Sequence, residues 1–122
     1  MLTRIGRKKG LDATVHPTTL DIVWAAGIYE GEGCVSRKGE GGMRTEVVCV
    51  SQKHRWILDR LCAFFGGSVG ISHYGAGSRY AKHELFVWNI CGARARGFLM
   101  TVYQFLSPHR RLRAKQVLGE SS

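Results

Sequence analysis

The chain has 122 residues, 44% of them hydrophobic and 10% aromatic, which is the composition of a single globular domain. Eighteen Lys and Arg residues against nine Asp and Glu residues give a net charge of +9, which attracts polyanions such as DNA and RNA. No apolar run approaches the length of a membrane span and no secretory signal is visible, so we expect neither a membrane protein nor a secreted one.

The first part of the chain is basic and carries no apolar periodicity. We therefore expect residues 1–16 to form a flexible basic arm, residues 17–118 to form one folded domain, and residues 119–122 to form a short tail. Thr18 or Thr19 is the expected N-cap of the first helix, because a threonine hydroxyl accepts a hydrogen bond from the free amides of a helix start.

Helical and alternating patterns of apolar residues divide the rest of the domain. They predict helices over residues 20–32, 54–65, 93–106 and 110–118. They also predict strands over residues 34–38, 43–53, 68–74 and 84–91. The order αββαββα, followed by a terminal helix, predicts an α+β fold in which one four-stranded antiparallel sheet carries its helices on one face.

Four cysteines occur at positions without the paired spacing of zinc sites or disulfide frameworks; they are Cys34, Cys49, Cys62 and Cys91. All four fall in segments that are otherwise apolar. We expect them to be small buried side chains of a protein that works in a reducing compartment.

Two glycines interrupt the first predicted helix. Gly27 and Gly31 are four residues apart and share one stripe of the helix with Trp24 and Ile28. Each glycine costs a helix interior about 1 kcal/mol relative to alanine. A pair of glycines on one face lets another backbone approach closely, and that backbone belongs either to a second helix or to this chain's own sheet.

The residues around these glycines resemble a known family. The sequence AAGIYEGEG at residues 25–33 resembles the LAGLIDADG signature, in the form that ends in EGEG. Residues 50–53, followed by residues 55–59, resemble the strand-to-helix junction of members with a single motif. Residues 105–108, followed by Arg110 and Arg111, resemble their basic closing segment. The resemblance covers about residues 18–118 and implies the saddle-shaped homing-endonuclease fold.

The resemblance implies a homing endonuclease that makes metal-dependent double-strand breaks in a long, pseudo-palindromic DNA site. A single motif per chain implies a homodimer, whose interface would be formed by Trp24, Gly27, Ile28 and Gly31. Such an enzyme would act in the cytoplasm or nucleoid of a prokaryotic or phage-infected cell, or in an organelle matrix. The alternative is a non-cleaving nucleic-acid-binding protein of the same fold, either an intron maturase or a transcriptional regulator.

The same resemblance places the chemistry at the end of the motif helix. Glu32 occupies the position of the family's metal-binding acid, and Gly31 is the second predicted metal ligand. A carboxylate is unfavourable at a helix C-terminus, and a divalent cation would relieve that repulsion. Oxygen ligands suit Mg²⁺, for which we expect Mn²⁺ to substitute. Glu30 projects to another side of the helix, so we assign it a structural role.

Three further catalytic residues follow from the matched positions. Gln52 stands where members of the family carry a polar residue that orders water near the metal ions. Arg110 and Arg111 stand where a lysine typically helps to stabilise the transition state. The implied reaction is metal-assisted hydrolysis of a phosphodiester.

The uncovered face of the predicted sheet would enter the major groove of double-stranded DNA. The residues predicted to contact DNA from this face, its loops and its ends are Ser36, Lys38, Arg44, Glu46, Lys53, Ser72, Tyr74, Arg79, Tyr80 and Lys82. The valine-rich run over residues 47–50 leaves the register of the second strand open. A slip by one residue would turn every side chain of that strand to the opposite face.

Overall fold

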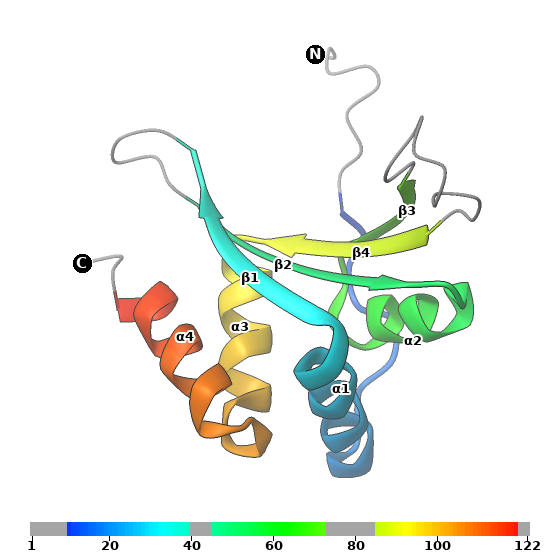
Figure 1. Cartoon of the computed structure of the whole chain (residues 1–122). Helices are drawn as coiled ribbons and strands as arrows, with labels where there is room; N and C mark the ends of the chain where they lie inside the picture. Colours follow the sequence, from blue (N-terminus) through cyan, green and yellow to red (C-terminus); the bar gives the residue numbers. More distant parts are fainter. Residues whose placement is uncertain (1–9, 40–44, 73–84, 120–122) are drawn as a thin grey trace.

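The computed structural model describes residues 10–39, 45–72 and 85–119 (Figure 1). Its strands are β1 (Gly33–Lys38), β2 (Thr45–Gln52), β3 (Ser68–Ser72) and β4 (Leu85–Cys91). Its α-helices are α1 (Thr19–Glu32), α2 (Arg55–Phe65), α3 (Ala93–Val102) and α4 (Pro108–Gly119), and a short 3₁₀ helix, η2 (Tyr103–Phe105), joins α3 to α4. The strands form one antiparallel sheet in the order β1-β2-β4-β3.

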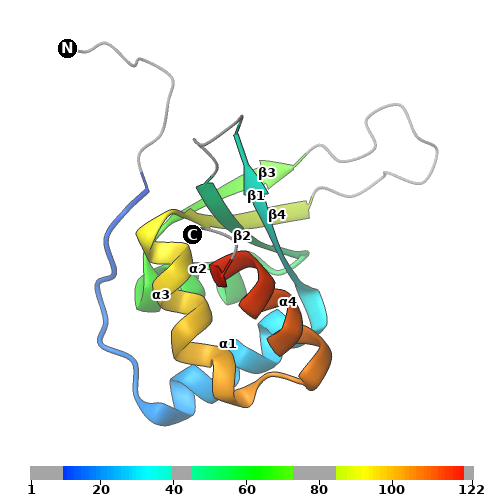
Figure 2. The same ribbon diagram turned by 90° about the vertical axis from the view of Figure 1, so that its left-hand side faces the viewer.

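The helices lie on one side of a curved sheet, and the other side of the sheet carries no described element (Figure 1, Figure 2). The predicted α+β fold with one four-stranded antiparallel sheet is therefore confirmed. None of the described helices is both long and apolar enough to cross a bilayer.

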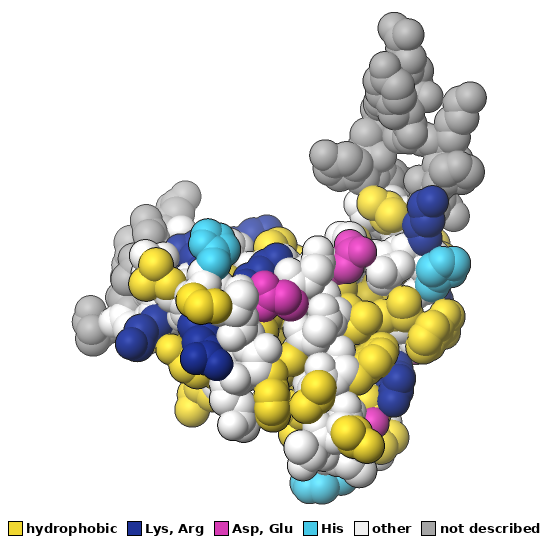
Figure 3. All heavy atoms as spheres, turned by 60° about the horizontal axis from the view of Figure 1, so that its bottom comes forward, with side chains coloured by type: hydrophobic (Ala, Val, Ile, Leu, Met, Phe, Trp, Pro, Cys, Tyr) yellow, Lys and Arg dark blue, Asp and Glu magenta, His cyan; other side chains and the backbone are white. Residues whose placement is uncertain are grey.

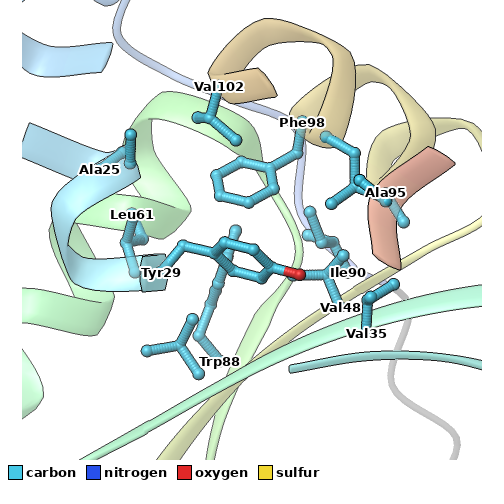
Figure 4. Packing of buried hydrophobic residues seen from close by; sticks show 14 of the residues in the cluster. Ala25, Tyr29, Val35, Val48, Leu61, Trp88, Ile90, Ala95, Phe98 and Val102 are labelled. Carbon is cyan, nitrogen blue, oxygen red and sulfur yellow. The ribbon is translucent and has the colours of Figure 1, made fainter. Parts of the chain in front are cut away.

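A central layer of aromatic side chains joins the helices to the sheet. Trp88 of β4, Tyr29 of α1 and Phe98 of α3 are almost completely buried. The Phe98 ring lies 5.5 Å from the Tyr29 ring and 5.3 Å from the Trp88 ring, both with edge-to-face geometry (Figure 4). The indole nitrogen of Trp88 donates a hydrogen bond to the carbonyl of Gly66. This packing fixes α1 against the sheet through Tyr29.

Both ends of α1 are explained by local chemistry. Thr18 is the N-cap: its hydroxyl accepts a hydrogen bond from the Asp21 amide, and the Asp21 carboxylate accepts one from the Thr18 amide. Gly33 is the C-cap and donates its amide to the carbonyl of Tyr29. A Cβ at Gly33 would lie 2.7 Å from Cε1 of Tyr29, closer still to Cδ1 of the same ring, and 2.8 Å from the Tyr29 carbonyl oxygen, so this position requires glycine.

The last helix begins earlier than the sequence predicted. The sequence predicts a helix over residues 110–118, whereas α4 starts at Pro108. Proline is well accommodated in a first helical turn because its missing amide would have no partner there. Ser107 precedes the helix and accepts hydrogen bonds from the amides of Arg110 and Arg111, through its hydroxyl and its carbonyl respectively.

The second half of the expected flexible arm is bound to the domain. The backbone of Leu11 exchanges two hydrogen bonds with that of Gly67, and the amides of Thr14 and Val15 both donate to the carbonyl of Ala63. The last carbonyls of a helix have no partner within the helix, and this segment supplies one for α2. The chain runs on from there to the start of α1 (Figure 2).

The register of β2 corrects one prediction. Glu46 lies on the helix-covered face together with Val48 and Val50, and it is only 2% exposed. The prediction that Glu46 contacts DNA from the open face is therefore wrong. The carboxylate of Glu46 instead accepts a hydrogen bond of 2.7 Å from the guanidinium of Arg96 in α3. Because side chains alternate along a strand, Val47 and Cys49 occupy the open face.

The cysteines also differ from the prediction of four buried side chains. Cys34 and Cys91 are exposed, whereas Cys49 and Cys62 are partly buried. Cys34 is the cross-strand partner of Cys49, and both lie on the open face of the sheet because Val35 and Val48 alternate with them toward the core. All four are free thiols in the structure.

Candidate functional site

The outward face of α1 is an apolar stripe that nothing in the described chain covers. Leu20 is 80% exposed and Val23 is 42% exposed, and they continue along the helix into Gly27 and Gly31. Hydrophobic side chains gather over this end of the molecule (Figure 3). A Cβ added at either glycine would meet no described atom within 4 Å. The glycines therefore do not serve contact with this chain's own sheet.

Trp24 and Ile28, which we predicted at the same interface, flank the stripe and are half-buried. The Trp24 ring contacts Phe64 edge to face and lies 4.2 Å below the guanidinium of Arg60. These two side chains thus contribute to the core of the monomer as well as to the edge of its exposed face.

Glu32 is the last residue of α1 and is exposed to solvent. No side chain or amide of the described residues makes a hydrogen bond or an ion pair with its carboxylate. An anion at this end faces the partial negative charge of the helix C-terminus. Glu32 therefore presents carboxylate oxygens to solvent that no described group binds directly.

Glu30 is fully engaged within the chain, in agreement with the structural role that we assigned to it. Its carboxylate accepts hydrogen bonds from the amide of Ser107 at 2.9 Å and from the hydroxyl of Ser107 at 2.7 Å. The backbone hydrogen bond from Ser107, followed by the side-chain one, holds the pKa of Glu30 below its usual value. Glu30 is therefore ionised at neutral pH.

The two predicted catalytic arginines contact backbone carbonyls of this chain. The Arg110 guanidinium donates to the carbonyl of Gly33 at 2.7 Å and to that of Glu30 at 3.1 Å. The Arg111 guanidinium donates to the carbonyl of Gln104 at 2.7 Å and lies over the Tyr103 ring. Arg110 is therefore next to the Glu32 segment, whereas Arg111 is held against η2.

Gln52 lies at the end of β2 that adjoins Glu32. Gly33 pairs with Val50, so the first residue of β1 and the last residues of β2 meet at one end of the sheet. The side-chain oxygen of Gln52 accepts a hydrogen bond of 3.0 Å from the amide of Lys53, which is exposed beyond the strand. The fold thus brings Glu32, Gln52 and Lys53 to the same end of the sheet.

Apart from Lys53, which is exposed beyond the end of β2, the predicted DNA-contacting residues divide into three groups. Ser36 and Lys38 of β1 lie on the open face with Ser72 of β3, as the cross-strand pairs show. Glu46 lies on the covered face, as described above. The others on sheet and loops fall outside the described residues, and they are Arg44, Tyr74, Arg79, Tyr80 and Lys82.

Sequence reasoning missed a polar centre on the open face. Asn89 of β4 pairs with Cys49 of β2, and the Cys49 thiol donates a hydrogen bond of 2.8 Å to the side-chain oxygen of Asn89. The alternation of Phe86, Trp88 and Ile90 toward the core carried the signal, because it places Asn89 on the opposite face.

A divalent cation at the helix end would have hard oxygen donors. The carboxylate of Glu32 and the backbone of Gly31 are both exposed, which fits Mg²⁺ or Mn²⁺ rather than a soft, thiolate-binding metal. Within the described ranges, no three His, Cys, Asp or Glu side chains gather closely enough to hold a metal ion. A single described chain thus offers only part of a coordination shell at this point.

No family model and no curated protein matches the chain. Among solved structures, it is similar to the archaeal intron-encoded homing endonuclease I-Vdi141I complexed with DNA, with a TM-score of 0.59 and 18% sequence identity. The match covers 82% of this chain and 67% of that protein's chain. At this level of identity, the likeness establishes that the two share a fold.

Proposed function

We propose that this chain is the subunit of a homodimeric, LAGLIDADG-type homing endonuclease that cuts both strands of double-stranded DNA. The fold is that of a DNA-bound homing endonuclease, and the net charge of +9 suits a polyanionic partner. The observation that carries the proposal is the outward face of α1. There, two open glycines lead to Glu32, an exposed carboxylate with no partner among the described residues.

The glycine stripe supports a symmetric dimer. A twofold axis beside α1 would pack Gly27 and Gly31 against the same residues of a second copy, an isologous contact. Small residues allow two helix backbones to approach closely, and the exposed Leu20 and Val23 would add apolar contact area. Such a contact would bring two copies of Glu32 together at the axis.

Paired Glu32 carboxylates are the proposed metal ligands, with Gly31 beside each of them. Bound Mg²⁺ or Mn²⁺ would supply Lewis acidity and a water molecule of lowered pKa for phosphodiester hydrolysis. Gln52 lies at the same end of the sheet and would orient water with the NH₂ group of its side-chain amide, since the amide oxygen binds Lys53. Lys53 is exposed there and would contact a phosphate.

The open face of the sheet is the proposed DNA-reading surface. Ser36, Lys38 and Asn89 point away from the helices and offer hydrogen-bond donors and acceptors to base edges. An antiparallel ribbon fits the major groove, and two such surfaces related by a twofold axis would read a long, nearly palindromic site.

A cleavage selection tests the proposal directly. Supercoiled plasmids that carry a randomised insert are incubated with the protein in Mg²⁺, Mn²⁺ or EDTA, and linear products are sequenced. We expect metal-dependent double-strand cuts at one pseudo-palindromic site, with none in EDTA. Glu32→Gln should abolish cutting and retain DNA binding. Asp59→Asn, which removes an equal charge from an exposed position of α2, should cut as the native chain does.

The same selection separates the alternative. Tight binding of DNA or RNA by the native chain without a cut in either metal would contradict the endonuclease and favour a maturase or regulator of the same fold. Sedimentation velocity at the protein concentrations used for cleavage tests the dimer independently. A native chain that stays monomeric on its target while still cutting both strands would exclude the proposed Glu32 pair.

A further inference from the structure

The C-terminus of α1 lies next to the N-terminus of α4. Each of these two helix ends lacks the charged residue that its helix dipole favours. The last turn of α1 contains no basic residue, although cations stabilise a helix C-terminus, and it carries Glu30 and Glu32 instead. The first turn of α4 contains no acidic residue, although anions stabilise a helix N-terminus. Each helix therefore needs a charge from outside itself.

The two helices supply these charges to each other. Arg110 of α4 places its guanidinium at the C-terminus of α1, where its two terminal nitrogens donate to the carbonyls of Glu30 and Gly33. The guanidinium also lies 5.1 Å from the centre of the buried Tyr29 ring. In return, the Glu30 carboxylate accepts both the amide and the hydroxyl of Ser107 at the N-terminus of α4. We call these contacts the reciprocal cap.

The reciprocal cap binds the backbone on both sides of Glu32. Glu30 lies two residues before it and Gly33 one residue after it, and both carbonyls are bound by the same planar guanidinium. The peptide between them is thereby fixed while the Glu32 side chain remains exposed. A lysine ammonium is a point charge and does not match two separated carbonyls as the rigid fork of an arginine does.

We propose that Arg110, supported by Glu30, is a positioning residue that sets the place of the Glu32 carboxylate, and that it does not itself contact DNA. This inference rests on the proposed function for the role of Glu32. It reassigns the arginine that the sequence placed at the transition state.

Three variants of the full-length chain test this inference, namely Arg110→Met, Arg110→Lys and, as the control, Arg113→Met. The control removes the same charge from an exposed position of the same helix. The first measurement is hydrogen exchange of the amides of residues 31–34, which requires neither DNA nor metal. The second is the affinity for Mn²⁺ of each variant in complex with the cleaved DNA duplex, monitored by electron paramagnetic resonance. The third is the cleavage rate over a range of DNA concentrations.

In Arg110→Met we expect faster exchange at residues 31–34 than in Arg113→Met. We also expect Mn²⁺ affinity and kcat to fall about tenfold or more, the usual loss when a group behind a metal ligand is removed. The KM for DNA should stay close to that of the control, since the guanidinium does not touch DNA in this proposal. Arg110→Lys should fall between the native chain and Arg110→Met, and it carries the comparison if Arg110→Met does not fold.

Equal exchange in Arg110→Met and Arg113→Met would overturn the reciprocal cap. Faster exchange with unchanged Mn²⁺ affinity and unchanged kcat would overturn its role in positioning Glu32, as would a rise in KM alone. A native chain that does not cut DNA contradicts the proposed function. In that case the exchange comparison still decides whether Arg110 holds this turn.

Discussion

The exposed glycines of α1 allow a prediction in which monomer stability and assembly change in opposite directions. Replacing Gly27 or Gly31 by alanine adds a methyl group where no described atom lies within 4 Å. Inside a helix, alanine is favoured over glycine by about 0.8–1 kcal/mol. Each substitution should therefore raise the free energy of unfolding of the monomer by about 1 kcal/mol, and the double variant by about 2 kcal/mol.

The dimer should respond in the opposite sense. If a second copy of α1 packs on this stripe, each added methyl group lies where two backbones approach most closely. We expect the double variant to dissociate at concentrations where the native chain is dimeric, and to lose double-strand cleavage. Gly33→Ala is the matched control, because its new Cβ would meet the Tyr29 ring inside the monomer. It should lower the free energy of unfolding by about 1–3 kcal/mol.

Urea unfolding monitored by circular dichroism gives the free energy of unfolding of the monomer, at a protein concentration where sedimentation velocity shows monomers only. Sedimentation at higher concentration gives the dissociation constant of the dimer. For a chain of this length, 1 kcal/mol corresponds to roughly 3–6 °C in Tm, so thermal scans provide a second measure. A lower free energy of unfolding for the Gly27→Ala monomer would refute the claim that nothing in this chain contacts Gly27. Native-like dimerisation of the double variant would refute the claim that the two glycines lie in the dimer interface.

Three further outcomes are expected. Lys38→Met should reduce DNA affinity and lower the salt slope of log K by about 0.9, whereas Glu46→Gln should leave both unchanged in filter binding, because Glu46 faces the helices. The lowered pKa of Glu30 contributes stability that is present above its unfolded pKa and is lost as the pH falls through its folded pKa. In urea unfolding from pH 7 to 3, the native chain should thus lose more stability than Glu30→Gln, and parallel curves would contradict the Ser107 contact. Cys34 should react with a thiol reagent faster than Cys62, which is partly buried and whose pKa burial raises; equal rates by mass spectrometry would contradict the register of β1.

Local chemistry in the sequence was sufficient for the elements and their order. The capping box between Thr18 and Asp21 marks the start of α1 in the residues themselves. The alternation of Phe86, Trp88 and Ile90 defines β4 and its covered face. The AAGIYEGEG segment at residues 25–33 located the helix end that carries the exposed Glu32. Each of these features depends on residues within a few positions of one another.

Only the tertiary structure decided which face Glu46 occupies. Residues 47–50 are all apolar, so either alternate set of β2 side chains could have faced the core. Glu46 lies on the covered face because Arg96 of α3 provides a partner for its carboxylate there. Likewise, nothing near Arg110 in the sequence indicates that it binds the carbonyls of Glu30 and Gly33, about eighty residues away. The composition and periodicity of a segment indicate how its backbone forms hydrogen bonds and which of its side chains are buried. The partner of a charged side chain depends on which distant helix end lies within hydrogen-bonding distance, and that is a property of the folded chain alone.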